Sequence, residues 1–197
     1  MPPRPLVNPL TLVILGLLAE QPLHPYAMRV LMRERGHDRI VGRALSSLYD
    51  AVNRLSAAGL IEAHAAEQEG RRPERTVYRL TSKGLDSLQG WIRQALADPE
   101  RAGQFTAAIS FMYGLPQDEA IGLLETRTTA LELLIEAGDN ALSAALEAGV
   151  PAIFLSEGRY SHALLRAEHD WLTAFTTQLR SGEVSWPHPN PSPQEPS

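Results

Sequence analysis

Residues 45–84 read LSSLYDAVNRLSAAGLIEAHAAEQEGRRPERTVYRLTSKG, and the hydrophobic pattern changes its period within this stretch. From residue 45 to 58 the apolar side chains recur every three or four positions, which predicts a helix that ends at Gly59. Residues 60–64 have the pattern of a strand, and residues 75–80 alternate polar and apolar side chains with a period of two. Between them residues 69–73 form a turn with a basic tip. Residues 81–84 begin another helix, which continues to about residue 98.

Two helices are predicted upstream of this stretch. The pair Asn8-Pro9 is a strong helix start, because Asn is a good N-cap and Pro is tolerated at the first helical position. This helix runs to about Glu20, and His24-Pro25 repeats the signal for a second helix that ends near residue 36. Three helices, a two-stranded hairpin and a fourth helix are the element order of a winged helix-turn-helix.

The second half of the chain is expected to be helical. A short helix is predicted from Phe105 to Tyr113, and a long one from Pro116 to a break at residues 149–151. A last helix extends to about Leu179. Both long helices carry an apolar stripe, so they form an antiparallel pair that needs a partner to bury enough surface. We therefore expect three regions: a DNA-binding domain (1–98), a helical dimerisation and sensing domain (99–183) and a disordered tail (184–197).

Charge is divided unevenly along the chain. The whole sequence has a net charge of −5, which by itself argues against a nucleic-acid partner. Residues 1–98, however, hold 13 basic and 10 acidic side chains, whereas residues 99–197 hold 5 and 13. The positive excess therefore lies where a phosphate-binding surface is expected. The chain has no cysteine, and its longest apolar run, Leu10–Ala19, is too short to span a bilayer. A cytoplasmic location without membrane contact is expected.

Three segments within residues 15–84 resemble the PadR family of bacterial transcriptional regulators. They are Leu15-Gly16-Leu17-Leu18 with Pro22-Leu23-His24-Pro25-Tyr26, then Ser47–Leu55 with Gly59-Leu60-Ile61, and finally Gly70–Gly84. Residues 124–127 and 167–172 are similar to the long helical C-terminal domain of one PadR branch. The resemblance implies a mainly α fold, a homodimer, a dyad-symmetric operator, repression, and an inducer that differs between members. The family often has His-Gly-Tyr where this chain has His24-Pro25-Tyr26, a departure that weakens the transfer of a ligand from better-known members.

The predicted helix at 45–58 carries the candidate base-reading residues. A helix fits the major groove, where Arg bonds guanine, Asn bonds adenine and hydroxyl groups hold phosphates. The polar side of this helix offers Ser46, Ser47, Tyr49, Asn53 and Arg54. The alternative is a merely solvated helix face, and the surrounding winged-helix pattern favours DNA contact.

The hairpin tip and the second helix supply further candidates. Arg71, Arg72 and Arg75 cluster at the tip, where Arg side chains contact phosphates or enter the minor groove. The alternative is a soluble turn. His24 and Tyr26 lie at the start of the second helix, an end that favours anions. For these two residues the favoured alternative is capping by His24 and core packing by Tyr26.

Six aromatic side chains are the candidate dimer or effector contacts of the helical part. They could line a dimer seam with a pocket for a small apolar or phenolic effector, or simply pack the core. The set is Trp91, Phe105, Phe111, Tyr113, Trp171 and Phe175.

Neither a metal site nor an enzyme is expected. His162, Glu168, His169 and Asp170 fit no metal signature, and no nucleophile elbow, P-loop or dinucleotide fingerprint occurs. No cofactor is therefore predicted. The rival to a DNA-binding repressor is a protein-interaction adaptor that reuses a winged helix.

Overall fold

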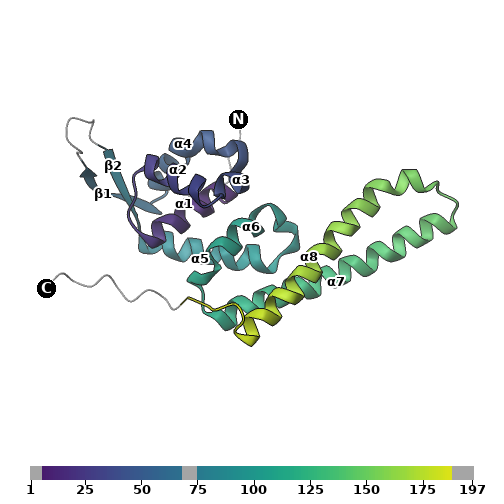
Figure 1. Cartoon of the computed structure of the whole chain (residues 1–197). Coiled ribbons are helices and arrows are strands. Elements are labelled where there is room, and N and C mark those ends of the chain that lie inside the picture. The colour runs from purple at the N-terminus through teal and green to yellow at the C-terminus, as the bar shows by residue number, and fades with distance from the viewer. Residues whose placement is uncertain (1–5, 68–74, 188–197) are drawn as a thin grey trace. The chain divides into compact units, whose positions relative to one another are not determined.

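The computed structural model describes residues 6–67 and 75–187. The chain forms two compact units (Figure 1): unit 1 comprises residues 1–95 and 101–114, and unit 2 comprises residues 96–100 and 115–197. Unit 1 contains the helix-turn-helix and the hairpin, and unit 2 contains the two longest helices.

Helix α1 (Pro9–Glu20) is the central helix of unit 1, and its residues 10–18 are all buried. It begins as predicted, because the Asn8 side chain accepts a hydrogen bond from the Thr11 backbone N–H at 3.1 Å. The Thr11 hydroxyl in turn accepts from the Asn8 backbone N–H, which completes a reciprocal cap. Since every residue from 10 to 18 is buried, α1 is surrounded by other elements on all sides.

The helix-turn-helix consists of α2 (Pro25–Glu34), α3 (His37–Val41), a 3₁₀ turn (Gly42–Ser47) and α4 (Leu48–Ala57). The predicted helix at 45–58 therefore begins three residues later than expected, and α3 was not predicted. Gly42 separates α3 from the 3₁₀ turn with φ +50° and ψ −131°, a conformation that side chains with a Cβ rarely adopt. Helix α3 therefore ends at this glycine, and α4 starts only after the 3₁₀ turn.

Strands β1 (Ile61–Glu67) and β2 (Arg75–Leu80) form an antiparallel hairpin in which Ile61 pairs with Leu80. A bulge between Ala63 and Ala65 shifts the register. Leu23 adds a short bridge to β2, since its backbone exchanges two hydrogen bonds with Tyr78. Val77 turns its side chain into the core, and the predicted turn at 69–73 lies outside the described residues.

Two further helices complete unit 1. Helix α5 (Ser82–Ala97) follows the hairpin as predicted, and a 3₁₀ turn (Pro99–Arg101) leads to α6 (Ala102–Phe111). Helix α6 packs against α1, and a second 3₁₀ turn (Met112–Gly114) follows it. The segment 101–114 thus belongs by its contacts to the same unit as the helix-turn-helix.

Unit 2 is an antiparallel hairpin of α7 (Gln117–Glu147) and α8 (Ser156–Ser181), joined through a 3₁₀ turn (Ala152–Leu155). Figure 1 shows the two helices side by side along their length. Their shared core is apolar and includes the buried side chains Leu124, Leu131, Leu172 and Leu179. The break predicted at 149–151 is confirmed, and α8 starts after an additional 3₁₀ turn.

The C-terminal segment of unit 2 continues past α8. A tail is expected from residue 184, but the Val184 backbone N–H donates to the Gln178 carbonyl and the Trp186 indole N–H to the Leu115 carbonyl. Residues 188–197, which include most of that tail, lie outside the described residues. Among the described helices, none is both long enough and apolar enough to cross a bilayer. The predicted fold class, mainly α with an N-terminal winged helix-turn-helix and long C-terminal helices, is confirmed.

Candidate nucleic-acid interface

Helix α4 presents a polar stripe to solvent. Tyr49 is 56% exposed, Asn53 is also exposed, and the two residues lie four apart on one helix face. Ser46 precedes them on the 3₁₀ turn, is exposed, and donates its hydroxyl hydrogen to the Arg43 carbonyl at 2.9 Å. The opposite face is buried, with Leu48, Ala51, Val52 and Leu55 in the core. Helix α4 is thereby anchored by its apolar side and offers a phenol and an amide outward.

Ser47 and Arg54 occupy a different position from Tyr49 and Asn53. Both are half-buried, and both line a small pocket of about 260 Å³ beside the start of α1. Pro9 and Leu10 form part of the same wall. Arg54 therefore lies at the margin of the exposed stripe, and only part of its surface is exposed to solvent.

His24 and Tyr26 at the start of α2 differ in their surroundings. The Nδ1 atom of His24 accepts a hydrogen bond from the Ala27 backbone N–H at 3.0 Å, so the predicted capping by His24 is confirmed. Core packing of Tyr26 is wrong, because this side chain is exposed. Its ring instead stacks on the His24 ring, with centroids 6.1 Å apart. As the second residue of α2, Tyr26 lies on the outer face of the first turn.

Two arginines of α2 extend the exposed surface beyond the candidates predicted from the sequence. Arg29 and Arg33 are exposed and lie three and seven residues after Tyr26, so the three side chains share one helix face. The opposite face buries Met28 and Met32. This spacing is present in the sequence, and the amphipathic pattern of α2 was the signal that could have identified the two cations.

Only part of the predicted wing lies within the described residues. Arg71 and Arg72 lie outside the described residues. The backbone of Arg75 pairs with Glu67 at the start of β2, and its side chain is likewise outside the described part. Nearer the hairpin base, Arg79 forms an ion pair with Glu62 at 2.7 Å, and both side chains are about half exposed.

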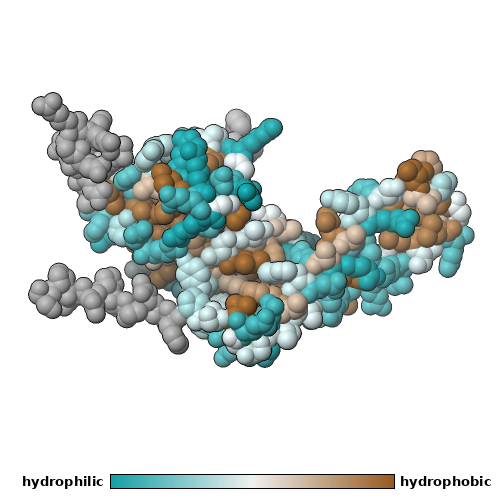
Figure 2. Space-filling view, viewed as in Figure 1, coloured by the Kyte–Doolittle hydropathy of each residue, from teal (hydrophilic) through white to brown (hydrophobic). Residues whose placement is uncertain are grey.

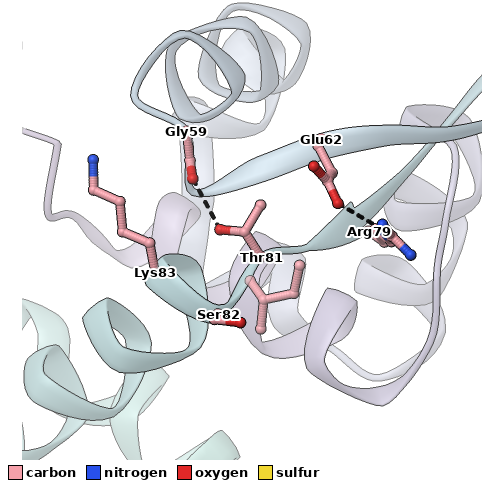
Figure 3. A pocket seen from close by; sticks show the side chains of 7 residues that line it. Gly59, Glu62, Arg79, Thr81, Ser82 and Lys83 are labelled. Carbon is pink, nitrogen blue, oxygen red and sulfur yellow. Dashed lines mark hydrogen bonds and ion pairs between the residues drawn. The ribbon is translucent and has the colours of Figure 1, made fainter.

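A crevice of about 560 Å³ lies at the base of the hairpin, where α4 ends and α5 begins (Figure 3). The Arg79–Glu62 pair forms one side, and Thr81, Ser82 and Lys83 form another. The Thr81 hydroxyl donates to the Gly59 carbonyl at 2.8 Å. The Thr81 hydroxyl is therefore bonded to the backbone that follows α4.

The predicted aromatic set divides between the two units. In unit 1, Phe105 and Phe111 are buried and pack the core, Trp91 is half-buried on α5, and Tyr113 is partly exposed. The Tyr113 hydroxyl donates to Glu20 at 2.6 Å, and burial together with this bond raises the pKa of Tyr113 well above its ordinary value. Glu20 also accepts from Arg35, so a small polar network joins α1 to the 3₁₀ turn after α6.

The other two aromatic residues belong to unit 2. Trp171 and Phe175 stack one helical turn apart on α8, with ring centroids 4.7 Å apart and planes at 19°. Trp171 is 44% exposed, which places the pair at the surface of its unit. Core packing therefore describes Phe105 and Phe111, whereas Trp171 is exposed.

Unit 2 also contains buried charge that was not predicted. The Arg127 side chain is 0% exposed, and its Nε donates to Glu168 of α8 at 2.6 Å. A second bond runs from Nη1 to the Asp98 carbonyl. Arg127 therefore ties α7 both to α8 and to the segment at 96–100.

The histidines of α8 contact carboxylates of α7 and α8. His162 contacts Asp139 at 2.8 Å, and Arg166 bonds the other oxygen of the same carboxylate. The Arg166 bond is the main reason that the pKa of Asp139 is lowered. His169 contacts Glu132 and Asp170 at 3.3 Å. Within residues 6–67 and 75–187, no group of three or more His, Asp or Glu side chains is arranged to hold a metal ion.

Comparison with known proteins finds a similarity between the N-terminal region and one family. Residues 14–90 match the model of the family described as "Transcriptional regulator PadR-like family". No curated protein matches the sequence. Among solved structures, Bacillus subtilis PadR in complex with operator DNA is 21% identical, with a TM-score of 0.37, over 86% of this chain and 94% of that one. Smu.1604c from Streptococcus mutans UA159 is 15% identical, with a TM-score of 0.33, over 88% and 98%.

Proposed function

We propose that this chain, whose residues 14–90 match the model of the PadR-like family of transcriptional regulators, is a homodimeric repressor that binds double-stranded DNA through α4. The observation that carries this proposal is the exposed stripe of Tyr49 and Asn53 on a helix whose other face is anchored in the core. A helix presented in this way has the dimensions and the chemistry that the major groove accepts.

Helix α2 is proposed to position α4 on the DNA. In a helix-turn-helix the first helix crosses the phosphate backbone while the second enters the groove. Tyr26, Arg29 and Arg33 give α2 one outward face with two cations and a phenol. Contacts of this kind fix register without reading sequence, whereas Asn53 of α4 has the amide that bonds adenine.

Arg54 and the wing have supporting roles in this proposal. Because Arg54 is half-buried, it reaches a base or a phosphate only from the edge of the α4 stripe. The tip residues Arg71, Arg72 and Arg75 are proposed to contact phosphates or the minor groove on the basis of their sequence alone. The net charge of +3 over residues 1–98 supports all of these contacts.

Dimerisation is proposed to use the exposed apolar face of α8. Tyr160, Leu164 and Trp171 are spaced four and seven residues apart, so they share one face, and all three are exposed. Figure 2 shows further hydrophobic residues gathered near the end of the hairpin where α7 joins α8. A two-fold axis through such a face would give two copies of α4, and B-DNA accepts them about 34 Å apart.

Regulation by a small apolar or phenolic effector is part of the same proposal. The surface pair Trp171 and Phe175 supplies stacked rings of the kind that bind such compounds. An effector that favours a dimer with a different spacing of the α4 helices would release the operator. The proposed location of the protein is the cytoplasm, and the proposed role is binding rather than catalysis.

The direct test is a mobility-shift titration of the full chain with DNA from upstream of its own gene. Asn53→Ala is expected to weaken specific binding by about tenfold, which corresponds to one good base contact. Tyr49→Ala, which removes a hydroxyl expected to hold a phosphate, should also weaken binding. Gln94→Ala, an exposed position on α5, is the matched control and should bind as the wild type does. No shift by the wild type at low salt would support the adaptor alternative and overturn the proposal.

A further inference from the structure

The C-terminal end of α4 is bonded to the N-terminal end of α5. Lys83 donates from its ammonium group to the Ala58 carbonyl at 2.8 Å, at the C-cap of α4. The Thr81 hydroxyl contacts the next two carbonyls, of Gly59 at 2.8 Å and of Leu60 at 3.1 Å. Three successive carbonyls at the exit of α4 are thus held by two side chains that lie more than 20 residues later.

The same residues also begin α5. The Thr81 hydroxyl accepts a hydrogen bond from the Gly84 backbone N–H at 3.0 Å, so Thr81 caps α5 while it holds α4. Gly84 permits this closeness, because a Cβ there would lie 2.0 Å from the Leu60 carbonyl oxygen. We name this arrangement of Thr81, Lys83 and Gly84 against residues 58–60 the α4–α5 junction. Figure 3 shows Thr81 facing Gly59 and Lys83 extending on the same side.

We propose that Thr81 and Lys83 are positioning residues that hold α4 at the angle needed to read bases. This inference rests on the proposed function, since it assigns α4 to the groove. The residues that read bases lie on α4 itself, while the junction grips only the end of that helix. A shift of this end changes where Asn53 points without removing any group that contacts DNA.

The geometry argues against the simpler role of Lys83 as a phosphate contact. Its ammonium is directed at the Ala58 carbonyl, where it also complements the negative end of the α4 dipole. Thr81 has no charge, yet it belongs to the same set of bonds. A purely electrostatic role would leave the participation of Thr81 unexplained.

The two roles predict different responses to salt. A lost phosphate contact lowers the slope of log affinity against log salt by about one unit, whereas a displaced α4 leaves the slope unchanged. Lys83→Met and Thr81→Val are therefore expected to reduce operator affinity by about fivefold or more, with the slope and the affinity for random DNA unchanged. Lys83→Arg and Thr81→Ser retain the donors and should restore operator affinity.

The experiment is a mobility-shift titration of full-length variants against operator and random duplexes at several salt concentrations. Amide hydrogen exchange of free protein accompanies it, and faster exchange of residues 55–60 in Lys83→Met and Thr81→Val is expected. A unit drop in slope for Lys83→Met, or unchanged operator affinity in both variants, overturns the inference. Because the exchange is measured on free protein, unchanged exchange rates at residues 55–60 in both variants also overturn the inference. If the wild-type protein does not shift its operator, the proposed function itself is contradicted. This outcome is distinct from those that overturn only the inference about Thr81 and Lys83.

Discussion

The Phe111 ring lies directly against the backbone of Gly16. A Cβ placed on Gly16 would stand 2.4 Å from Cδ1 of Phe111, closer than two such carbons approach in folded proteins. Helix α6 therefore packs onto α1 at a point where only hydrogen is tolerated. Since α1 is the buried centre of unit 1, this contact fastens the segment 101–114 to the helix-turn-helix.

We expect Gly16→Ala to lower the free energy of unfolding by about 2 kcal/mol or more, because the added methyl overpacks the core. The measurement is urea denaturation of the full chain. Gly103→Ala is the matched control, since it lies on α6 and a methyl group there would have nothing within 4 Å. That variant should be neutral or slightly stabilising. Equal stability of wild type and Gly16→Ala would contradict the close contact.

The buried pair of Arg127 and Glu168 is expected to dominate the stability of unit 2. Glu168→Gln removes the carboxylate that accepts from Nε of a fully buried guanidinium, and we expect a loss of about 3 kcal/mol in the free energy of unfolding. Glu125→Gln is the control, because it breaks an exposed pair with Arg180 and should cost about 0.5 kcal/mol or less. Equal losses of unfolding free energy in the two variants would show that the Arg127–Glu168 pair stabilises unit 2 no more than the exposed pair does.

His37 is expected to make the stability of unit 1 sensitive to pH. Burial lowers the pKa of His37 below its ordinary value of 6.5, and the nearby Arg35 lowers it further, while Glu20 opposes the shift. The ring packs against Phe111 at 5.4 Å, and within the described structure its buried Nδ1 has no hydrogen-bond partner. The folded state therefore favours neutral His37, whereas the unfolded chain takes up a proton below about pH 6.5.

The contribution of His37 to stability is thus expected to be complete above about pH 6.5 and to decrease as the pH falls below that value. Urea denaturation at about pH 7.5 and about pH 5.5, on either side of the ordinary histidine pKa, measures the difference. His37→Phe should lose less stability than the wild type on acidification. Identical pH dependence in the two proteins would show that His37 does not titrate differently on folding.

The exposed face of α8 is expected to determine the oligomeric state. Leu164 is 54% exposed, and Leu164→Lys places a charge in the proposed dimer face. We expect the dissociation constant of the dimer to rise by about tenfold or more, as measured by sedimentation equilibrium. Thr173→Lys lies on a different, exposed side of α8 and should leave the dimer intact. A wild type that sediments as a monomer would remove the basis of the proposed face.

The wing is expected to contribute affinity without sequence information. Arg71→Ala with Arg72→Ala should lower the slope of log affinity against log salt by about two units, one for each lost phosphate contact. Arg180→Ala, which removes a paired cation of unit 2, is the control and should not change the slope. Unchanged affinity and slope in the double variant would mean that the tip does not touch DNA.

Local signals in the sequence were sufficient for the starts of α1, α2, α5 and α7 and for the hairpin. Asn8-Pro9 and His24-Pro25 set the first residues of α1 and α2, because capping and the fixed φ of proline act within three residues. The change of period after Gly59 likewise identified β1 and β2. These features depend on neighbours in the chain, so no knowledge of the fold was needed to predict them.

Tertiary structure decided which side chains are available and which are held. Only the fold shows that Arg54 is half-buried while Tyr26 is exposed, because burial depends on elements distant in the sequence. The bond from Lys83 to Ala58 joins residues 25 positions apart, and that from Arg127 to Glu168 joins residues 41 apart. No periodic pattern encodes such pairs, since each requires two helices to pack at one particular register. The sequence by itself therefore determined that a helix with one apolar and one polar face follows the first two helices, and the packing determined which side chains hold the C-terminal end of that helix.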